Sequence, residues 1–495
     1  MARISPEVSR SLDEYLIHAG YQPRTVTPDK VRLGGSLRRD EFYMPLGWFS
    51  AAMQCVSGDV LGIAFGQYGG CAVLPRSISI QDQIQLGKNI KKAKAGFHYG
   101  VITVSPNDPI SKVMEIRNEK GYSSFPVVDD DGMLVGVITK KNYHPAKHAD
   151  LLVKDRMVKP PDMIVGTEEI TLAEANELLL SKGKGILPIV SSDGHYRCSV
   201  FWADIEKHAR FPDEFVDKNG RYRFAGAVST FEEDRERAVA LVSDAACDIL
   251  IVDTSNLKSD FGKDTIEWLA QRFPDIPIVA GNIIDEEGFR LAVDAGADVV
   301  KIGQGPGYGC TTREVKRTGR GQATAFQSVA AARDAYNEKH HVYVPLCGDG
   351  GIEDTGDMLV AYAMGMDFLM MGKYFGEFTE SAAPLKRKQV PIAVDGKTMV
   401  VPVLLKEYWG EASRRAANIS RYGYTSKKHF VPEGEEGLIP HRGLIHDPEE
   451  GINIDITFVK KSFSESGALT PRQFSQSVTL ELQSSGSREE GRPKV

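Results

Sequence analysis

The chain has 495 residues, 42% of them hydrophobic, which is enough for one large core and a second, smaller domain. Its formal net charge of -7 argues against a general nucleic-acid-binding protein, which needs a basic surface. The six cysteines are dispersed with no C-x-x-C pair, so we predict neither disulfides nor a zinc site and expect a reducing, cytoplasmic setting. A polar N-terminus and the absence of any apolar run near the roughly 18 residues that span a bilayer predict a soluble protein with no membrane partner.

Two regions of the chain predict parallel strands joined by helices. The first holds the apolar runs 45–53 and 71–75, with a helix expected over 57–70 between them. The second begins near residue 222 and alternates short apolar runs with longer amphipathic stretches. Its runs are 224–229, 248–255, 276–283, 298–303, 342–350 and 367–372, and its helices include 231–245 and 285–297. These eight strands match a closed (β/α)₈ TIM barrel, so we predict an α/β fold of this kind.

The region between these strands, residues 97–213, carries one pattern twice. Each copy predicts a strand, a helix and a β-hairpin, with turns at Asp131-Gly132 and Ser192-Asp193-Gly194. An internal duplication of about fifty to sixty residues indicates two modules that share an interface. The copies, 97–153 and 154–213, resemble tandem CBS modules, which in other proteins commonly bind adenine nucleotides. A regulatory adenine or guanine nucleotide and a purely structural insert both remain open.

The segment after the last predicted strand, residues 376–440, differs from the barrel in composition. A hairpin is predicted around 390–403. The glycines and mixed charges of the segment from residue 407 onward predict loops outside the core. Long loops of this kind are usually functional lids. The tail 484–495 is expected to be mobile unless a neighbouring subunit holds it.

A glycine-dense loop over residues 304–313 contains Cys310 and follows the run 298–303. In a barrel of this type the active site lies at the C-terminal ends of the strands, and glycines allow such a loop to turn its backbone groups toward a ligand. A Rossmann motif is excluded because Tyr308 and Cys310 stand where glycine is needed. The residues alone leave two interpretations of Cys310, a nucleophile or a small buried apolar side chain.

Two further strand ends predict a nucleotide-binding rim. Asp349 can accept hydrogen bonds from ribose hydroxyls, and the backbone amides of Gly350 and Gly351 can hold a phosphate. Gly372 and the Lys373 ammonium can add to this phosphate site. Their convergence predicts a nucleoside monophosphate as ligand.

At this point a family resemblance becomes specific. The segments GQGPGYGCTTREVKRTGRGQATA, CGDGGIEDTGD, MMGKYFGEFTES and EYWGEASRRA, in this order, resemble the characteristic segments of the IMP dehydrogenase and GMP reductase family. The similarity covers nearly the whole chain. It implies a catalytic barrel formed by 1–96 and 214–495, with the CBS pair inserted between the second and third strands.

The resemblance implies an NAD-dependent IMP dehydrogenase, which oxidises inosine 5′-monophosphate to xanthosine 5′-monophosphate in guanine nucleotide (GMP) biosynthesis. Cys310 would attack C2 of IMP, a hydride would leave to NAD⁺, and a covalent thioimidate would remain. A mobile flap carrying Arg421 and Tyr422 would then hydrolyse this intermediate, with Thr312 helping to activate the water.

The resemblance also assigns binding residues and partners. For the nucleotide they are Met53, Asp349, Gly351, Gly372, Lys373, Tyr408, Gly410, Glu411 and Glu433, the last facing N1 of hypoxanthine. For the cofactor they are Asp253, Thr254, Ser255, Asn282, Gly303 and Gly305. A potassium ion is expected on the carbonyls of Gly305, Gly307 and Cys310, with Glu490 and Gly491 of a neighbouring subunit. A homotetramer, or an octamer formed through the CBS modules, is implied.

The chain departs from the family pattern where Tyr308 replaces the serine that usually contacts the 5′-phosphate. Ala412 likewise stands where glycine is common. Two other functions therefore remain open. GMP reductase shares the barrel, the cysteine and the nucleotide site but uses NADPH, and the Arg421-Tyr422 pair favours the dehydrogenase over it. A non-catalytic nucleotide sensor acting through the CBS pair is the other.

Overall fold

The computed structural model describes residues 4–38, 42–93, 96–99, 101–120, 123–202, 211, 213–394, 397–416 and 433–491. The chain divides into two compact units. The larger comprises Met1–Lys91, Asp213–Phe215 and Tyr222–Val495, and the smaller comprises Lys92–Pro212 and Val216–Arg221. Among the described residues, no helix is both long enough and apolar enough to span a membrane.

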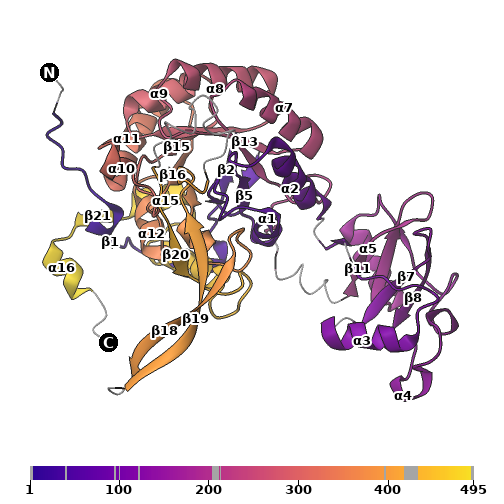
Figure 1. Cartoon of the computed structure of the whole chain (residues 1–495). Helices are drawn as coiled ribbons and strands as arrows, with labels where there is room; N and C mark the ends of the chain where they lie inside the picture. Colours follow the sequence, from indigo (N-terminus) through magenta and orange to yellow (C-terminus); the bar gives the residue numbers. More distant parts are fainter. Residues whose placement is uncertain are drawn as a thin grey trace. The chain divides into compact units, whose positions relative to one another are not determined.

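Eight parallel strands of the larger unit close into a barrel, in the order β12-β13-β14-β15-β16-β17-β4-β5 (Figure 1). The strands are β4 (Trp48–Ser50), β5 (Cys71–Leu74), β12 (Ala225–Val228), β13 (Ile249–Asp253), β14 (Ile278–Ile283), β15 (Val299–Ile302), β16 (Leu346–Asp349) and β17 (Phe368–Met371). Each lies within an apolar run predicted from the sequence. The predicted (β/α)₈ barrel is therefore confirmed.

Helices follow the barrel strands and surround them. They are α1 (Asp59–Gly66), α2 (Ile80–Lys92), α7 (Glu233–Ala245), α8 (Asp260–Arg272), α9 (Glu286–Asp294), α10 (Thr312–Val315), α11 (Gln322–His340), α12 (Thr355–Ala363) and α13 (Lys373–Gly376). Four begin at a side-chain cap, in which Ser79, Ser259, Asp285 or Asp354 accepts a backbone N–H of the first turn. Inside the barrel, alternate strand residues such as Phe49 and Ile251 form one buried apolar cluster, which fixes the strand ends that carry the site.

A half-buried carboxylate in the first turn of α12 gives a pH-dependent prediction. Burial, aided by the charges of Asp354 and Glu353, raises the pKa of Asp357 from 3.8 to about 6. The protonated form of Asp357 is thus favoured more strongly in the folded protein than in the unfolded chain. Protonation of Asp357 therefore adds to the stability of the fold, fully below about pH 4, and this contribution is lost as the pH rises through about 6. We expect Asp357→Asn to raise the free energy of unfolding at pH 7 by roughly 1 to 3 kcal/mol, because asparagine carries no charge and still accepts the Glu353 amide.

Urea unfolding of Asp357→Asn at pH 5 and at pH 7 checks this expectation, since the gain in stability must be larger at pH 7. Asp264→Asn, which removes an exposed carboxylate from a different helix, α8, is the matched control. An equal gain at both pH values, or the same gain in the control, would contradict the prediction.

A three-stranded antiparallel sheet follows the barrel in the chain. Its strands β18 (Leu385–Val394) and β19 (Lys397–Trp409) form a long hairpin that projects away from the barrel in Figure 1, and β20 (Glu436–Pro440) pairs with β19. The hairpin predicted around 390–403 is confirmed. The prediction of loops beyond it is wrong for 407–409 and for β20.

Paired charges explain why the polar sequence concealed the end of β19. Lys406 is buried, and its ammonium donates to the carbonyls of Thr379 and Ser381, both at 3.2 Å. Glu407 forms ion pairs with Lys386 and Arg415. The strand therefore carries charged side chains where an alternating apolar pattern would have identified it.

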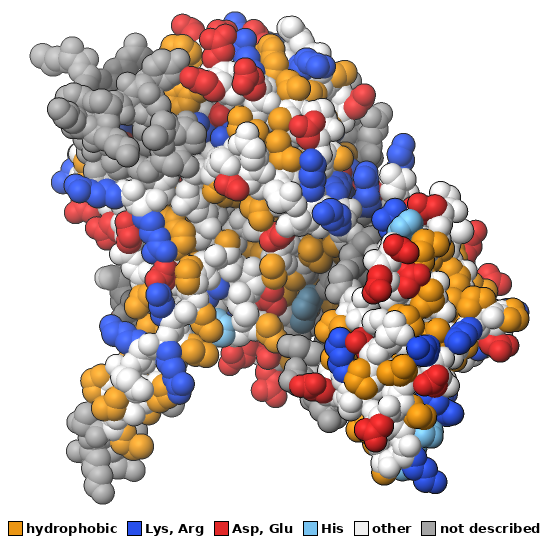
Figure 2. Space-filling view, turned by 45° about the vertical axis from the view of Figure 1, so that its right-hand side comes forward, with side chains coloured by type: hydrophobic (Ala, Val, Ile, Leu, Met, Phe, Trp, Pro, Cys, Tyr) orange, Lys and Arg blue, Asp and Glu red, His pale blue; other side chains and the backbone are white. Residues whose placement is uncertain are grey.

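The projecting hairpin has a mixed surface. Figure 2 shows hydrophobic and basic side chains side by side along it. Met399 and Val400 are 53% and 62% exposed, and Lys386 lies on the neighbouring strand. The part of the hairpin whose side chains are described therefore exposes both apolar and basic groups.

The two ends of the described chain lie together. Strand β1 (Tyr15–His18) pairs antiparallel with β21 (Thr479–Leu482), and α16 (Ser485–Glu490) follows. Arg488 of α16 forms an ion pair with Asp13. The structure gives residues 485–490 a helix and a contact with the N-terminal segment, while the mobility of the tail stays a prediction.

The remaining elements of the larger unit are short or C-terminal. They are η1 (Leu12–Glu14), η2 (Pro28–Lys30), β2 (Gly35–Ser36), β3 (Tyr43–Met44), α14 (Ile452–Glu465) and α15 (Pro471–Ser477). The N-terminal segment packs on the start of α11, where Arg10 donates its N–H to the Thr324 hydroxyl at 2.8 Å and accepts the Ala323 N–H at 3.1 Å. This contact fastens the chain immediately beyond the glycine-dense loop.

The smaller unit contains the same arrangement twice. One copy has α3 (Ile110–Lys120), β7 (Ser124–Val128) and β8 (Leu134–Thr139), and the other has α5 (Leu172–Lys182), β10 (Ile186–Val190) and β11 (Tyr196–Phe201). The pairing shifts by one residue at the same place in each hairpin, after Val127 and after Ile189. The structure therefore contains the duplication predicted from the sequence, while its identity as a CBS pair stays a prediction. Its other elements are β6 (His98–Tyr99), α4 (Pro145–His148), η3 (Val153–Asp155) and β9 (Gly166–Thr167).

Candidate active site

A cavity of about 500 Å³ opens at the C-terminal ends of the barrel strands. It brings together many of the residues that the sequence indicated. These are Met53, Asp253, Thr254, Ser255, Gly307, Cys310, Thr312, Tyr408, Gly410, Glu411 and Glu433. The lining also includes residues that the sequence did not indicate, among them Arg76, Ser229, Phe231 and Lys316.

Other predicted residues lie outside the lining of this cavity. Asn282, Gly303, Gly305, Asp349, Gly351, Gly372 and Lys373 belong to the neighbouring strand ends and loops. Glu490 and Gly491 lie at the end of α16. Arg421 and Tyr422 lie outside the described residues.

Cys310 presents its thiol to the cavity. It is exposed, whereas the other five cysteines are buried. Its backbone N–H donates to the Gly307 carbonyl at 2.9 Å, which curls the loop just before α10. The interpretation of Cys310 as a small buried apolar side chain is therefore wrong, and its interpretation as a nucleophile stays a prediction.

The contrast among the cysteines predicts selective labelling. Burial raises the pKa of Cys55 and of Cys247 to about 12, so these thiols stay protonated as well as inaccessible. We expect iodoacetamide to modify one thiol per native chain, and peptide mass spectrometry to place it at Cys310. Cys310→Ala should remain unlabelled until denaturant is added. Labelling of a second cysteine at a similar rate in the native protein would contradict the prediction.

A chain of hydrogen bonds leads from the thiol to a carboxylate. The Cys310 thiol donates to the Thr312 hydroxyl at 3.3 Å, and that hydroxyl donates to Glu433 Oε2 at 2.9 Å. Lys316 forms an ion pair with the other oxygen, Oε1, of the same carboxylate. All donors point toward Glu433, so the arrangement can pass a proton from the sulfur to the carboxylate.

Backbone hydrogen bonds hold Glu433 in this position. Thr311 donates its N–H to the Glu433 carbonyl, and the Glu433 N–H donates to Ala412, both at 2.9 Å. On the other side, Glu435 donates its N–H to the Gly309 carbonyl at 2.9 Å. Three segments distant in the sequence are thereby joined around the thiol.

A buried lysine connects three other predicted residues. Lys301, on β15, is completely buried, and its ammonium donates to Asp253 at 2.9 Å, to Asp349 at 2.6 Å and to the Asn282 side-chain oxygen. The Asn282 amide donates to the same Asp349 oxygen at 2.9 Å and to the Gly303 carbonyl at 2.5 Å. Burial by itself would lower the pKa of Lys301, but the two carboxylates raise it well above its ordinary value.

The glycine pair after β16 has the conformation expected of a phosphate-binding turn. Gly350 and Gly351 have φ values of +84° and +69°, which L-residues rarely adopt. Gln322 fixes the turn by donating its side-chain amide to the carbonyls of Asp349 and Gly350, both at 2.8 Å. The Gly350 N–H donates to the Met370 carbonyl at 3.4 Å, so the predicted phosphate contact of this turn rests on the Gly351 N–H.

Lys373 and Tyr308 form a second polar corner. The Lys373 ammonium lies 4.5 Å from the centre of the Tyr308 ring and donates to Glu353 at 2.7 Å. Burial alone would lower the pKa of Lys373, but Glu353 raises it. The Tyr308 ring packs edge-on against Tyr408, at 5.8 Å between ring centres. Tyr308, which replaces the usual serine, therefore lies beside the cation predicted to hold the phosphate.

The loop that carries Gly305, Gly307 and Cys310 supplies the predicted carbonyl ligands of a potassium ion. Gly305 has φ +80°, and a Cβ added there would lie 2.3 Å from the Arg313 side chain, so the loop can turn in this way only with glycine. Among the described residues, no group of three or more His, Cys, Asp and Glu side chains could hold a metal ion. Neutral carbonyls of Gly305, Gly307 and Cys310 are hard oxygen ligands without charge, which suits K⁺.

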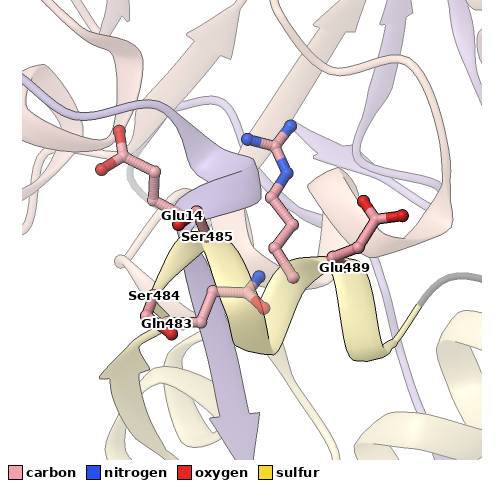
Figure 3. Close-up of a pocket in the computed structure, with 6 residues that line it drawn as sticks. Glu14, Gln483, Ser484, Ser485 and Glu489 are labelled. Atoms are coloured by element: carbon pink, nitrogen blue, oxygen red, sulfur yellow. The ribbon is translucent and has the colours of Figure 1, made fainter.

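The tail lies beside a different pocket. A cavity of about 460 Å³ is lined by residues of α16 and by Glu14 (Figure 3). Glu489 projects from α16 at its edge, and the predicted cation ligands Glu490 and Gly491 follow directly. That Glu490 and Gly491 bind a cation of a neighbouring subunit stays a prediction.

Comparisons with known proteins agree with this geometry. The family description "IMP dehydrogenase / GMP reductase domain" matches residues 9–494. An inosine-5′-monophosphate dehydrogenase of Tritrichomonas foetus is 35% identical over 99% of this chain and 97% of its own length. One of Aquifex aeolicus is 31% identical over 90% of this chain and 88% of its own.

A solved structure has the same fold over the whole chain. It is a Trypanosoma brucei GMP reductase variant in complex with guanosine 5′-monophosphate, with a TM-score of 0.77 and 25% identity, covering 99% of this chain and 98% of that one. Both sequence and fold are therefore similar along the full length, including the inserted unit. The chain belongs to the IMP dehydrogenase and GMP reductase family, a family of oxidoreductases.

Proposed function

We propose that the protein is an NAD-dependent IMP dehydrogenase that converts inosine 5′-monophosphate to xanthosine 5′-monophosphate, in the route to guanine nucleotides. The observation that carries this proposal is the exposed Cys310 thiol, which lies in a cavity and is hydrogen-bonded through Thr312 to Glu433. The curated relatives named IMP dehydrogenase support it.

The first half of the reaction forms a bond from Cys310 to the purine. The thiol proton passes through Thr312 to Glu433, the sulfur attacks C2, and the hydride on C2 departs, which leaves a covalent thioimidate. Bound NAD⁺ supplies the acceptor for this hydride. Water then adds to C2 and the C2–S bond breaks, which releases the oxidised nucleotide and restores the thiolate.

The nucleotide site follows from the residues around the thiol. The Asp349 carboxylate accepts the ribose hydroxyls, while Gly351, Gly372 and Lys373 hold the phosphate. The base lies between Met53, Gly410, Glu411, Tyr408 and Glu433, with Glu433 facing its N1 edge. Because Glu433 also accepts a hydrogen bond from Thr312, the same carboxylate can contact the base and accept the thiol proton.

The dinucleotide occupies the other half of the cavity. Asp253, at the end of β13, accepts the hydroxyls of the nicotinamide ribose, and Thr254, Ser255 and Asn282 surround it. Thr254 is rigid, since its hydroxyl donates to the Gly281 carbonyl at 2.9 Å. Gly303 and Gly305 allow the loop backbone to approach the ring closely.

A potassium ion on the carbonyls of Gly305, Gly307 and Cys310 would order the loop that carries the thiol, and Glu490 and Gly491 of a neighbouring subunit would complete its ligands. We place Arg421 and Tyr422 on a flap that enters the site after the dinucleotide leaves and, with Thr312, directs the water. Arg421 can act as a base only when its guanidine is neutral, and an active site closed to solvent would have to favour that neutral form.

GMP reductase is the second candidate, because the solved structure with the same fold is one. It would use the same thiol and nucleotide site but reduce guanosine 5′-monophosphate with NADPH and release ammonia. Arg421 and Tyr422 favour the dehydrogenase, since a reductase does not need to activate water for hydrolysis.

The deciding experiment follows the reduced-nicotinamide absorbance of the purified protein in two mixtures. Steady NADH formation from IMP, NAD⁺ and K⁺ supports the dehydrogenase, and replacement of K⁺ by tetramethylammonium should slow it at least ten-fold, by an order-of-magnitude estimate for a disordered catalytic loop. Consumption of NADPH with GMP, but no response to IMP, would establish the reductase. No response in either mixture would leave the non-catalytic sensor.

For the smaller unit, we propose a tandem CBS pair that binds an adenine or guanine nucleotide and regulates turnover. The duplicated hairpins with their shared register shift support it. We also propose a cytoplasmic homotetramer that pairs into an octamer through these modules. Mass photometry with and without ATP or GTP tests both proposals.

A further inference from the structure

Lys301 is a charged side chain in an apolar strand whose other residues build the barrel core. Its neighbours Val299, Val300 and Ile302 are completely buried, and so is Lys301 itself. Its ammonium contacts three side chains that come from the ends of three different strands, Asp253 on β13, Asn282 on β14 and Asp349 on β16. All three of its N–H donors are thereby used.

Such a group is costly to bury unless its partners are well placed. Removing an ammonium from water costs several kcal/mol, and the surrounding carboxylates must offset this. Here two carboxylates and one amide oxygen surround one ammonium, and the salt bridges to Asp253 and Asp349 measure 2.9 and 2.6 Å. A leucine or methionine would fill the same space in the core without that cost. The positive charge of Lys301 is therefore explained by the two carboxylates that it contacts.

The two carboxylates also depend on the lysine. Asp253 lines the cavity, and Asp349 precedes the Gly350–Gly351 turn. Both contact the same nitrogen, so without its positive charge they would repel each other in a poorly solvated place. One would then take up a proton or turn away, and would no longer present a fixed, charged acceptor.

We propose that Lys301 is a positioning residue that holds both ribose-binding carboxylates, Asp349 for the nucleotide and Asp253 for the dinucleotide, and so couples the two halves of the site. This inference rests on the proposed function, which assigns a ribose to each carboxylate. Binding of one ligand fixes one carboxylate, and through the shared ammonium it fixes the other. Each ligand therefore strengthens the binding of its partner.

The test measures binding in a chain that cannot turn over. In a Cys310→Ala background, calorimetric titration gives the affinity for IMP alone, for NAD⁺ alone, and for each with the other saturating. We expect Lys301→Met to lower the affinity for each ligand at least ten-fold. We also expect each ligand no longer to raise the affinity for the other. Lys301→Arg should restore most of this mutual effect, because a guanidinium can donate to both carboxylates.

Lys91→Met is the matched control. Lys91 is also a buried lysine of the barrel, paired with Asp248 at 2.7 Å, but Asp248 lies at the opposite end of β13 from Asp253. Lys91→Met should destabilise the protein as Lys301→Met does, seen as a similar fall in melting temperature, and change neither affinity more than two-fold.

Three results would overturn the inference: loss of affinity for one ligand only, equal losses in Lys91→Met, or no loss in Lys301→Met. The proposed function fails separately. If the Cys310→Ala protein binds GMP and NADPH but not IMP and NAD⁺, the same comparison of variants is made with that pair, and the expectation for Lys301 is unchanged. If it binds neither pair, the ribose sites and the role of Lys301 are both rejected.

Discussion

Replacing Cys310 with alanine is expected to lower the turnover of IMP by roughly four orders of magnitude, since removal of a covalent nucleophile costs on this scale. The alanine cannot form the bond to C2, and the remaining groups can only orient the reactants. The binding of IMP should change little, because the thiol reacts with the base but does not hold the ribose or phosphate. NADH absorbance followed over hours gives the residual rate, and titration gives the affinity.

Cys198→Ala is the control for this substitution. Cys198 is a buried cysteine of β11 in the smaller unit, 1% exposed and remote in sequence from the loop. Its replacement should leave turnover within a factor of about two, as expected for a side chain that serves only packing. If Cys310→Ala retains more than about a tenth of the wild-type rate, which covalent catalysis does not allow, the thiol is not the nucleophile.

Glu433→Gln is expected to slow the first NADH burst by roughly 100-fold, the usual size of a lost proton acceptor. Glutamine keeps the shape, and its carbonyl still accepts the Thr312 hydroxyl, but it cannot take up the thiol proton. It also loses the ion pair with Lys316. Rapid mixing of enzyme, IMP and NAD⁺ measures the burst rate, which reports the formation of the thioimidate before any hydrolysis.

Lys316→Met separates the proton path from the ion pair. The Lys316 side chain is 52% exposed, so solvent screens its interaction with Glu433 and its removal should cost much less than the loss of the carboxylate. A normal burst in Glu433→Gln, followed by slow steady turnover, would show that the carboxylate acts in hydrolysis and not in activation of the thiol.

The barrel could be predicted from the sequence because its strands are buried on both sides. The runs 248–255 and 367–372 each contain four consecutive apolar residues, 249–252 and 368–371, and glycine or a polar residue ends each run. The loop with Cys310 could be located in the same way, since it follows such a run. The end of β19, residues 407–409, was missed because Glu407 is held there by ion pairs with Lys386 and Arg415 and not by apolar alternation.

Lys301 illustrates what such a pattern does not reveal. Within the run 298–303 it looks like one lysine in an apolar segment, and nothing local indicates that it reaches side chains on three other strands. A lysine at the centre of a buried parallel strand was the available clue, because that position admits a charge only with partners. The partners themselves depend on the register of the barrel, which periodicity does not give.

The contact between Thr312 and Glu433 was hidden for a similar reason. These residues are far apart in the sequence, and the backbone hydrogen bonds that join their segments do not follow any repeat. The sequence predicted that both residues belong to one site, yet only the structure reveals the order of donors between them.

The pairing that closes the barrel also determines how the chain can fold as it is synthesised. Trp48 of β4 pairs with Leu369 of β17, and β5 pairs with β12. The outer edge of β5 therefore has no barrel neighbour until β12, at residues 225–228, has been synthesised, and that of β4 has none until β17, at 368–371. The smaller unit is nearly continuous, and its hairpins can form early from local contacts. The nascent protein therefore carries a folded insert beside an open, apolar sheet edge, which makes the unfinished barrel the part that needs protection from aggregation.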